Sequence, residues 1–140
     1  MVKLDLDGIK FEFRVDDYRK CDVNIWDDTW CNVYVRLYTE DLMINYKSDG
    51  ETLLCCEVEA LYECLGKLID GSMKENTLVT NIEPDFTFTL HPSEDRKYYM
   101  DWEFALWHEG GLTSSTIHTL FDSIDIKELY EYLKTVIEGS

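Results

Sequence analysis

Three histidines and five cysteines are the side chains of this 140-residue chain best suited to bind a metal ion. Transition metals are held by converging imidazole and thiolate ligands, which short spacings such as C-x-x-C or H-E-x-x-H announce. Neither spacing occurs, and His91, His108 and His118 are widely separated. We therefore expect the histidines to be surface or packing residues, and we predict no bound metal and no other cofactor.

Nucleophilic catalysis has no recognisable motif in the chain either. A nucleophilic serine or cysteine needs an adjacent base, but no G-x-S-x-G elbow or Cys-His signature occurs. Ser114-Ser115 has the composition of a glycine-flanked turn, and the neighbours Cys55 and Cys56 would point to opposite faces of a strand. Paired carboxylates for glycoside hydrolysis stay open, because the fold sets their separation. The sequence predicts no enzyme and no catalytic residue.

Aromatic residues beside acidic ones form a more distinctive pattern. Aromatic side chains contribute much of the energy of protein interfaces, and neighbouring carboxylates can pair with lysine or arginine on a partner. About two in three aromatics are nevertheless expected in the core. The pattern occurs at Trp26-Asp27-Asp28-Thr29-Trp30, at Asp101-Trp102-Glu103 and at Trp107-His108-Glu109.

The charge balance limits the classes of partner. The chain has 29 acidic and 13 basic residues, a formal net charge of −16, and the excess is spread along its whole length. Such a surface repels nucleic-acid phosphates and anionic membranes. It suits electrostatic steering toward a basic protein, although acidic residues also serve solubility alone.

The cysteines and the N-terminal residues indicate a reducing compartment. Five cysteines are an odd number without the spacing of a disulfide framework, and the first residues lack the apolar run of a signal peptide. No stretch approaches the roughly eighteen apolar residues of a transmembrane helix. We expect a cytoplasmic protein.

The elements that would position these side chains follow from hydrophobic periodicity. Alternation across Gly8 predicts a hairpin, and Ser48-Asp49-Gly50 predicts a turn between an apolar run at 42–46 and a strand at 52–56. The strands expected in the chain are 2–7, 9–15, 21–25, 30–38, 42–46, 52–56, 78–83, 85–91, 98–107 and 116–121.

Two segments have the three- and four-residue spacing of amphipathic helices, at about 57–70 and 125–138. Gly71 suits a C-terminal cap, and Asp125 with Glu128 resembles a capping box. The chain therefore predicts a single α+β domain over residues 1–140, with a mainly antiparallel sheet and two helices packed against it.

This order of segments resembles the WapI-type immunity proteins, which are cytosolic antidotes to secreted polymorphic toxins. The matching stretches are WCNVYVRL at 30–37, the helix around 58–65, IEPDFTF at 82–88 and the closing strand and helix at 116–137. The resemblance implies stoichiometric binding to a cognate toxin domain, often a nuclease. It implies no catalytic residue.

A basic toxin cleft would be complemented by an acidic, aromatic surface that occludes it. Strand ends, where loops project, are the expected place for that surface. The predicted partner-binding residues are Asp27, Asp28 and Trp30, with Glu40 and Asp41 at the rim. Two alternatives stay open: an acidic protein-binding or structural accessory domain of unknown partner, and a small enzyme that uses carboxylates or a thiol.

Overall fold

The computed structural model describes residues 1–20, 29–73, 77–79, 86–91, 97–108 and 111–139. Its elements follow the order ββββα twice, which confirms the α+β prediction. They are β1 (Val2–Leu6), β2 (Ile9–Asp16), β3 (Trp30–Tyr38), β4 (Asn45–Leu54), α1 (Cys55–Asp70), β5 (Thr77–Val79), β6 (Phe86–His91), β7 (Lys97–His108), β8 (Gly111–Asp122) and α2 (Ser123–Glu138). The strands form two antiparallel four-stranded sheets, β1-β2-β3-β4 and β5-β6-β7-β8.

The hairpin predicted around Gly8 is confirmed. β1 pairs with β2 in a register that places Leu6 opposite Ile9. The two turn residues, Asp7 and Gly8, have φ of 55° and 95°, the left-handed values that two-residue hairpins require. Strict alternation along these strands and β3 gives the first sheet one buried and one wet face.

The turn predicted at Ser48-Asp49-Gly50 was wrong. These residues lie in the middle of β4, where they pair with Val35, Tyr34 and Val33 of β3. The apolar run predicted as a strand from Leu42 instead begins with the β3–β4 connection, and β4 starts only at Asn45. Ladder pairing with a strongly alternating neighbour thus overrides local turn composition.

Two strands of the second sheet, β7 and β8, are longer than the sequence indicated. β8 begins at Gly111, and Ser114 and Ser115 pair there with Ala105 and Phe104, so the predicted turn at these serines was wrong. The predicted strand at 21–25 and most of the one at 78–83 lie outside the described residues.

Each helix follows directly from the last strand of its sheet. α1 begins at Cys55, two residues earlier than predicted, and ends at Asp70, followed by the cap Gly71, whose φ of 78° is left-handed. In α2 the capping box lies three residues before the predicted one. Asp122 is the cap and accepts from the Asp125 amide at 2.8 Å, while Asp125 accepts from the Asp122 amide at 3.1 Å. Residue 125 is therefore the third helical residue.

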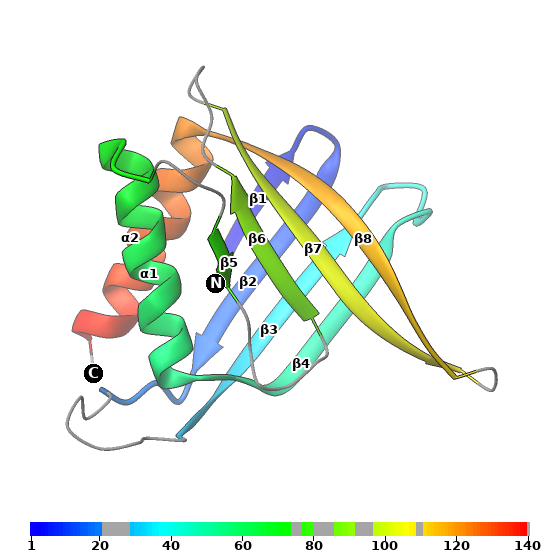
Figure 1. Ribbon diagram of the computed structural model, residues 1–140, viewed down its shortest axis with the longest axis horizontal. Coiled ribbons are helices and arrows are strands. Elements are labelled where there is room, and N and C mark those ends of the chain that lie inside the picture. Colours follow the sequence, from blue (N-terminus) through cyan, green and yellow to red (C-terminus); the bar gives the residue numbers. More distant parts are fainter. Residues whose placement is uncertain (21–28, 74–76, 80–85, 92–96, 109–110, 140) are drawn as a thin grey trace.

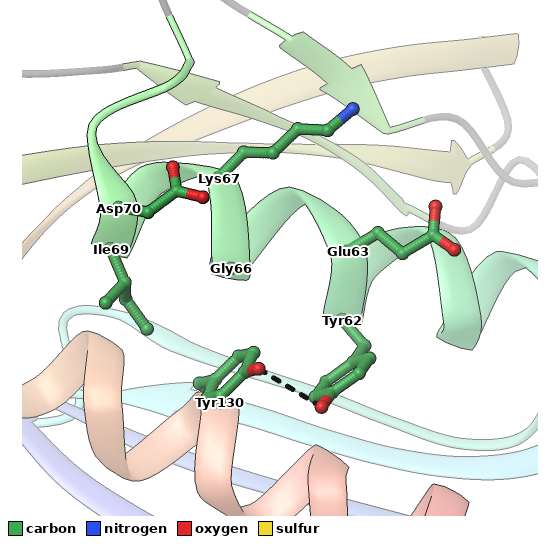
Figure 2. Close-up of a pocket in the computed structure, with 7 residues that line it drawn as sticks. All are labelled: Tyr62, Glu63, Gly66, Lys67, Ile69, Asp70 and Tyr130. Atoms are coloured by element: carbon green, nitrogen blue, oxygen red, sulfur yellow. Dashed lines mark hydrogen bonds between the residues drawn. The ribbon is translucent and has the colours of Figure 1, made fainter.

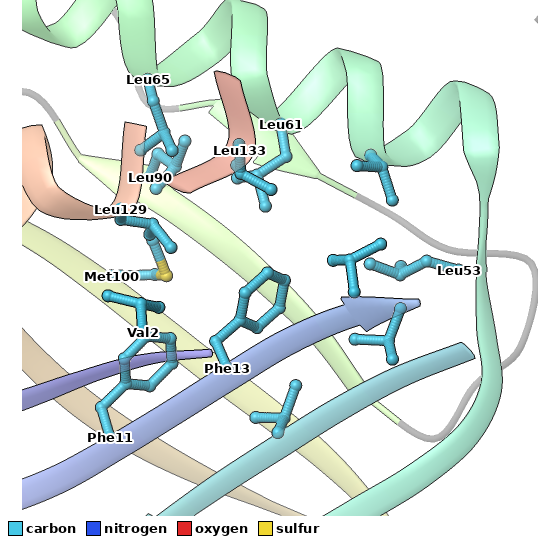
Figure 3. Close-up of a cluster of buried hydrophobic side chains, with 14 of the residues drawn as sticks. Val2, Phe11, Phe13, Leu53, Leu61, Leu65, Leu90, Met100, Leu129 and Leu133 are labelled. Carbon is cyan, nitrogen blue, oxygen red and sulfur yellow. The ribbon is translucent and has the colours of Figure 1, made fainter. Parts of the chain in front are cut away.

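The core lies between the two sheets and the helix pair, which packs along one side of them (Figure 1). Aromatic rings join the three layers, because Phe11 of β2 packs 5.6 Å from Trp102 of β7 and 5.7 Å from Phe121 of β8. Phe13 meets Tyr132 of α2 edge-on at 6.4 Å, and aliphatic side chains from both helices fill the remainder (Figure 3). Trp102, which belonged to a candidate interface pattern, is 2% exposed and is a core residue.

Among the elements described, neither helix has the length and apolarity needed to cross a membrane.

Candidate functional site

Of the predicted partner-binding residues that the structure describes, Trp30 lies at one end of β3, and Glu40 and Asp41 lie beyond the other. Asp27 and Asp28 lie outside the described residues, and Trp30 is half-buried at the start of β3, opposite Leu54. Glu40 and Asp41 are exposed just beyond the other end of that strand. Because a strand rises about 3.3 Å per residue, roughly 25 Å separates Trp30 from Glu40 and Asp41. Trp30 lies near the start of α1, because its partner Leu54 directly precedes that helix, whereas the β3–β4 connection lies at the sheet end away from the helices (Figure 1).

Glu40 and Asp41 belong to a compact turn, here called the β3–β4 tip and defined as Thr39 to Ile44. Thr39 closes it at both ends, because its amide donates to the Ile44 carbonyl at 2.9 Å and its carbonyl accepts from the Leu42 amide at 3.0 Å. The Thr39 hydroxyl donates to Asp41 at 2.7 Å and accepts from the Ile44 amide at 3.1 Å. The tip is therefore fixed by its own short polar side chains.

The Asp41 carboxylate is held ionised by the same network. The hydroxyl of Thr39 and then the amide of Met43, which donates to Asp41 at 3.1 Å, lower the pKa of this carboxyl below its ordinary value. The carboxylate consequently keeps its charge in mildly acidic solution, where a basic partner would still meet it.

The β3–β4 tip carries two large apolar side chains, which the sequence predicts to lie in a strand. Leu42 is 55% exposed and Met43 is 85% exposed. Leu42 also has a φ of 60°, a left-handed conformation that suits glycine or asparagine and costs a branched residue about 1 kcal/mol. An exposed leucine recovers little of that cost through packing. In the sequence, the only indication of this exposed pair is that Leu42 and Met43 directly follow two acidic residues.

A shallow hollow of about 480 Å³ lies between the β3–β4 tip and the β1–β2 turn. Asp5 and Lys10 form an ion pair of 2.6 Å beside it, and Glu40 and Asp41 complete its charged lining. The Lys10 ammonium and the Gly8 amide lower the pKa of Asp5, while Asp5 raises the pKa of Lys10. With Asp7 in the adjacent turn, four acids lie at this end of the sheet, beside Lys10 and Arg36, whose guanidinium stacks 3.9 Å from the Tyr38 ring centroid, so acids outnumber bases there.

A second hollow, of about 520 Å³, opens between the two helices. Tyr130 of α2 stacks on Tyr62 of α1 with ring centroids 4.7 Å apart and donates to its hydroxyl at 3.1 Å (Figure 2). This hydrogen bond and burial raise the pKa of Tyr62 to about 12. The Tyr62 phenol therefore stays protonated at neutral pH and does not act as a base. The stacked pair of Tyr62 and Tyr130 packs the two helices together and lines the hollow.

Strand pairing in the second sheet brings together two histidines that are distant in the sequence. On its outer face, His91 contacts Asp101 at 2.8 Å and His118 contacts the other oxygen of the same carboxylate at 2.6 Å. Burial raises the pKa of Asp101, but the hydrogen bonds from His118 and His91 outweigh it, so this pKa lies below its ordinary value. Within the described ranges, no three or more Cys, His, Asp or Glu side chains converge to hold a metal ion.

Two of the described cysteines, Cys31 and Cys55, are core residues, and Cys56 and Cys64 are half-buried beside the core. Cys31 of β3 and Cys55 of α1 are fully buried with their sulfurs 3.0 Å apart. Burial raises the pKa of Cys64, which keeps it a poorly nucleophilic thiol.

Comparison with known protein families gives one match, which covers nearly the whole chain. Residues 3–139 match the family model described as the immunity protein WapI-like family. The match includes both sheets and both helices. No curated protein and no solved structure matches the chain.

Proposed function

Because the chain belongs to the immunity protein WapI-like family, we propose that it protects the cytoplasm of the producing cell by binding and neutralising one cognate secreted toxin domain. The match over residues 3–139 is the observation that carries this proposal. Neutralisation takes place by occlusion, in which the folded chain covers the working surface of the toxin and performs no chemistry of its own.

The net charge of −16 indicates the kind of toxin surface that is covered. A nuclease has to present basic residues to nucleic-acid phosphates, and an acidic protein can occupy the same cleft. Long-range attraction then raises the association rate, by as much as one to three orders of magnitude at low ionic strength. A basic toxin domain with nuclease activity is therefore the proposed target.

The surface proposed for this contact comprises Asp27, Asp28, Trp30, Glu40 and Asp41. The end of the sheet that carries Glu40 and Asp41 is favoured among the described parts, because exposed acids are combined there with a rigid turn. Separate alanine variants of the two groups would divide the contributions of the two ends. Thermal melting of each variant has to accompany the binding assay, since Trp30 is half-buried and packs in β3.

The test uses the toxin domain encoded next to the gene for this chain. Co-expression should restore growth of cells that produce the toxin domain, and the purified proteins should form a one-to-one complex by light scattering. Titration calorimetry should show weaker binding as NaCl rises, and stopped-flow mixing should show that the change lies mainly in the association rate. Failure both to protect cells and to form a complex would contradict the proposal, whereas tight but salt-insensitive binding would contradict only the electrostatic part.

A further inference from the structure

We infer that Leu42 and Met43 form an apolar anchor that enters a hydrophobic pocket on the basic toxin, while Glu40 and Asp41 pair with lysine or arginine at its rim. The inference rests on the proposed function and deepens it by naming the part of the surface that holds the partner. Neither apolar residue belongs to the acidic and aromatic set predicted from the sequence.

Exposure is the first argument. Leu42 and Met43 are consecutive and are 55% and 85% exposed. Single exposed apolar residues are ordinary, but an adjacent pair at the far end of a hairpin combines apolar area with steric access. In Figure 1 the β3–β4 connection lies away from both helices.

Rigidity is the second argument. The hydrogen bonds of Thr39 and Asp41 fix both the start and the end of the tip, and one of them holds the Met43 amide directly. A turn that is ordered before binding loses little conformational entropy when the complex forms. Leu42 and Met43 are thus presented to a partner on a backbone of one fixed geometry, which suits a recognition site.

The backbone of Leu42 is the third argument. Its φ of 60° is unfavourable for leucine, and a glycine would adopt this conformation without strain. An exposed leucine at such a position contributes little to the fold. The presence of an isobutyl group at this position is explained if that group contacts a partner, since strained residues cluster at binding sites.

The charges around the tip identify the partner as a basic protein. Glu40 and Asp41 flank the anchor, and Asp5 and Asp7 lie at the same end of the sheet. A second copy of the chain would bring like charges together, and an anionic bilayer would repel the same carboxylates. A hydrophobic pocket bordered by lysine or arginine would bury Leu42 and Met43 and form ion pairs with Glu40 and Asp41.

The decisive variants are Leu42→Gly and Met43→Ser in the full chain, with Ile124→Ser as the matched control. Ile124 is an aliphatic residue that is 66% exposed on α2, far from the tip in the sequence and the fold. We expect Leu42→Gly to keep or raise the melting temperature and yet to weaken toxin binding by about ten- to thirty-fold, the effect typical of an interface anchor. Met43→Ser should weaken binding similarly, and Ile124→Ser should leave it unchanged.

The outcomes separate the anchor from the function. If the unaltered chain binds the toxin and both tip variants bind it within about two-fold, the anchor is refuted while the proposed function stands. If the unaltered chain does not bind, the proposed function itself fails. If the tip variants instead abolish self-association in sedimentation, or binding to phosphatidylcholine vesicles, the occupant is a second copy or a membrane and the inference is overturned.

Discussion

Thr119 is a buried polar residue whose hydroxyl makes two hydrogen bonds inside the core. It is 1% exposed, its hydroxyl accepts from the indole nitrogen of Trp102 at 3.1 Å, and it donates to the Met100 carbonyl at 2.7 Å. Thr119→Val conserves the shape but removes both contacts. We expect the free energy of unfolding to fall by about 1–3 kcal/mol, as measured by urea denaturation.

A double-mutant cycle separates this loss from simple repacking. Trp102→Phe removes the indole N–H, so the cost of Thr119→Val should be smaller in that background. The exposed Thr116, on the same strand, provides the control, because Thr116→Val should change the free energy of unfolding by less than about 0.5 kcal/mol. Additive effects of the two core substitutions would contradict the coupling.

Asp101 makes the free energy of unfolding depend on pH. The direction of this dependence is set by its hydrogen bonds to His91 and His118. Because its pKa in the folded state lies below the ordinary 3.8, its contribution is fully present above about pH 4 and is lost as the pH falls through the lowered value. The difference in unfolding free energy between the parent chain and Asp101→Asn should therefore shrink only as the pH falls below about pH 4. Chemical denaturation at several pH values measures it, and a constant difference would refute this linkage.

Features of single residues could be predicted from the sequence only where the residues involved are close together along the chain. Glu40 and Asp41 were predicted as exposed charges because they follow a clear strand, and both are exposed. The cluster of His91, Asp101 and His118 could not be predicted, because only the pairing of three strands brings these residues together. The exposure of Leu42 and Met43 was missed since apolar residues after a strand are usually assigned to the next one.

At the scale of secondary-structure elements, two glycines of α1 should respond oppositely to the same substitution. Gly66 has ordinary helical geometry, and a Cβ there would meet Tyr130 at 3.4 Å, a normal contact. Gly66→Ala should therefore stabilise the helix by about 0.5–1 kcal/mol. Gly71→Ala should destabilise it by about 1 kcal/mol, because its φ of 78° is left-handed. Thermal melting of both variants provides the comparison, and equal signs would contradict this account.

Elements with strong periodicity were predicted well, and those set by neighbouring strands were not. The β1–β2 hairpin, β3 and both helices have patterns that local physics determines. β4 contains Ser48, Asp49 and Gly50 because it pairs along the whole of β3, a non-local effect. Likewise the cap of α2 is Asp122, since β8 ends there, although Asp125 and Glu128 have the spacing of a capping box.

The whole molecule consists of two ββββα units that close one core. Each sheet has its own apolar face, and Phe11 contacts rings from the other sheet, so neither unit buries its face alone. The sequence showed two successions of strands and a helix, but it did not show that the strands divide into two sheets. That division depends on which edges remain unpaired, and no local pattern specifies it.

A net charge of −16 on this single core predicts that salt has opposite effects on folding and on binding. Raising NaCl from about 0.01 M to about 1 M shortens the Debye length from about 30 Å to about 3 Å. Repulsion among the 29 acids is then screened, so we expect the melting temperature of the free chain to rise by a few degrees. The same screening removes attraction to a basic toxin, so the complex should weaken over the same range.

Both responses can be measured on one preparation, by scanning calorimetry for folding and by titration for binding. Chloride is the suitable anion, because sulfate stabilises proteins through surface exclusion whatever their charge. If the free chain and the complex were both stabilised by NaCl, the interface would be predominantly apolar and the tip anchor would act without electrostatic attraction. Opposite slopes instead mean that the acidic surface tolerates self-repulsion in the free state and that a basic partner relieves it.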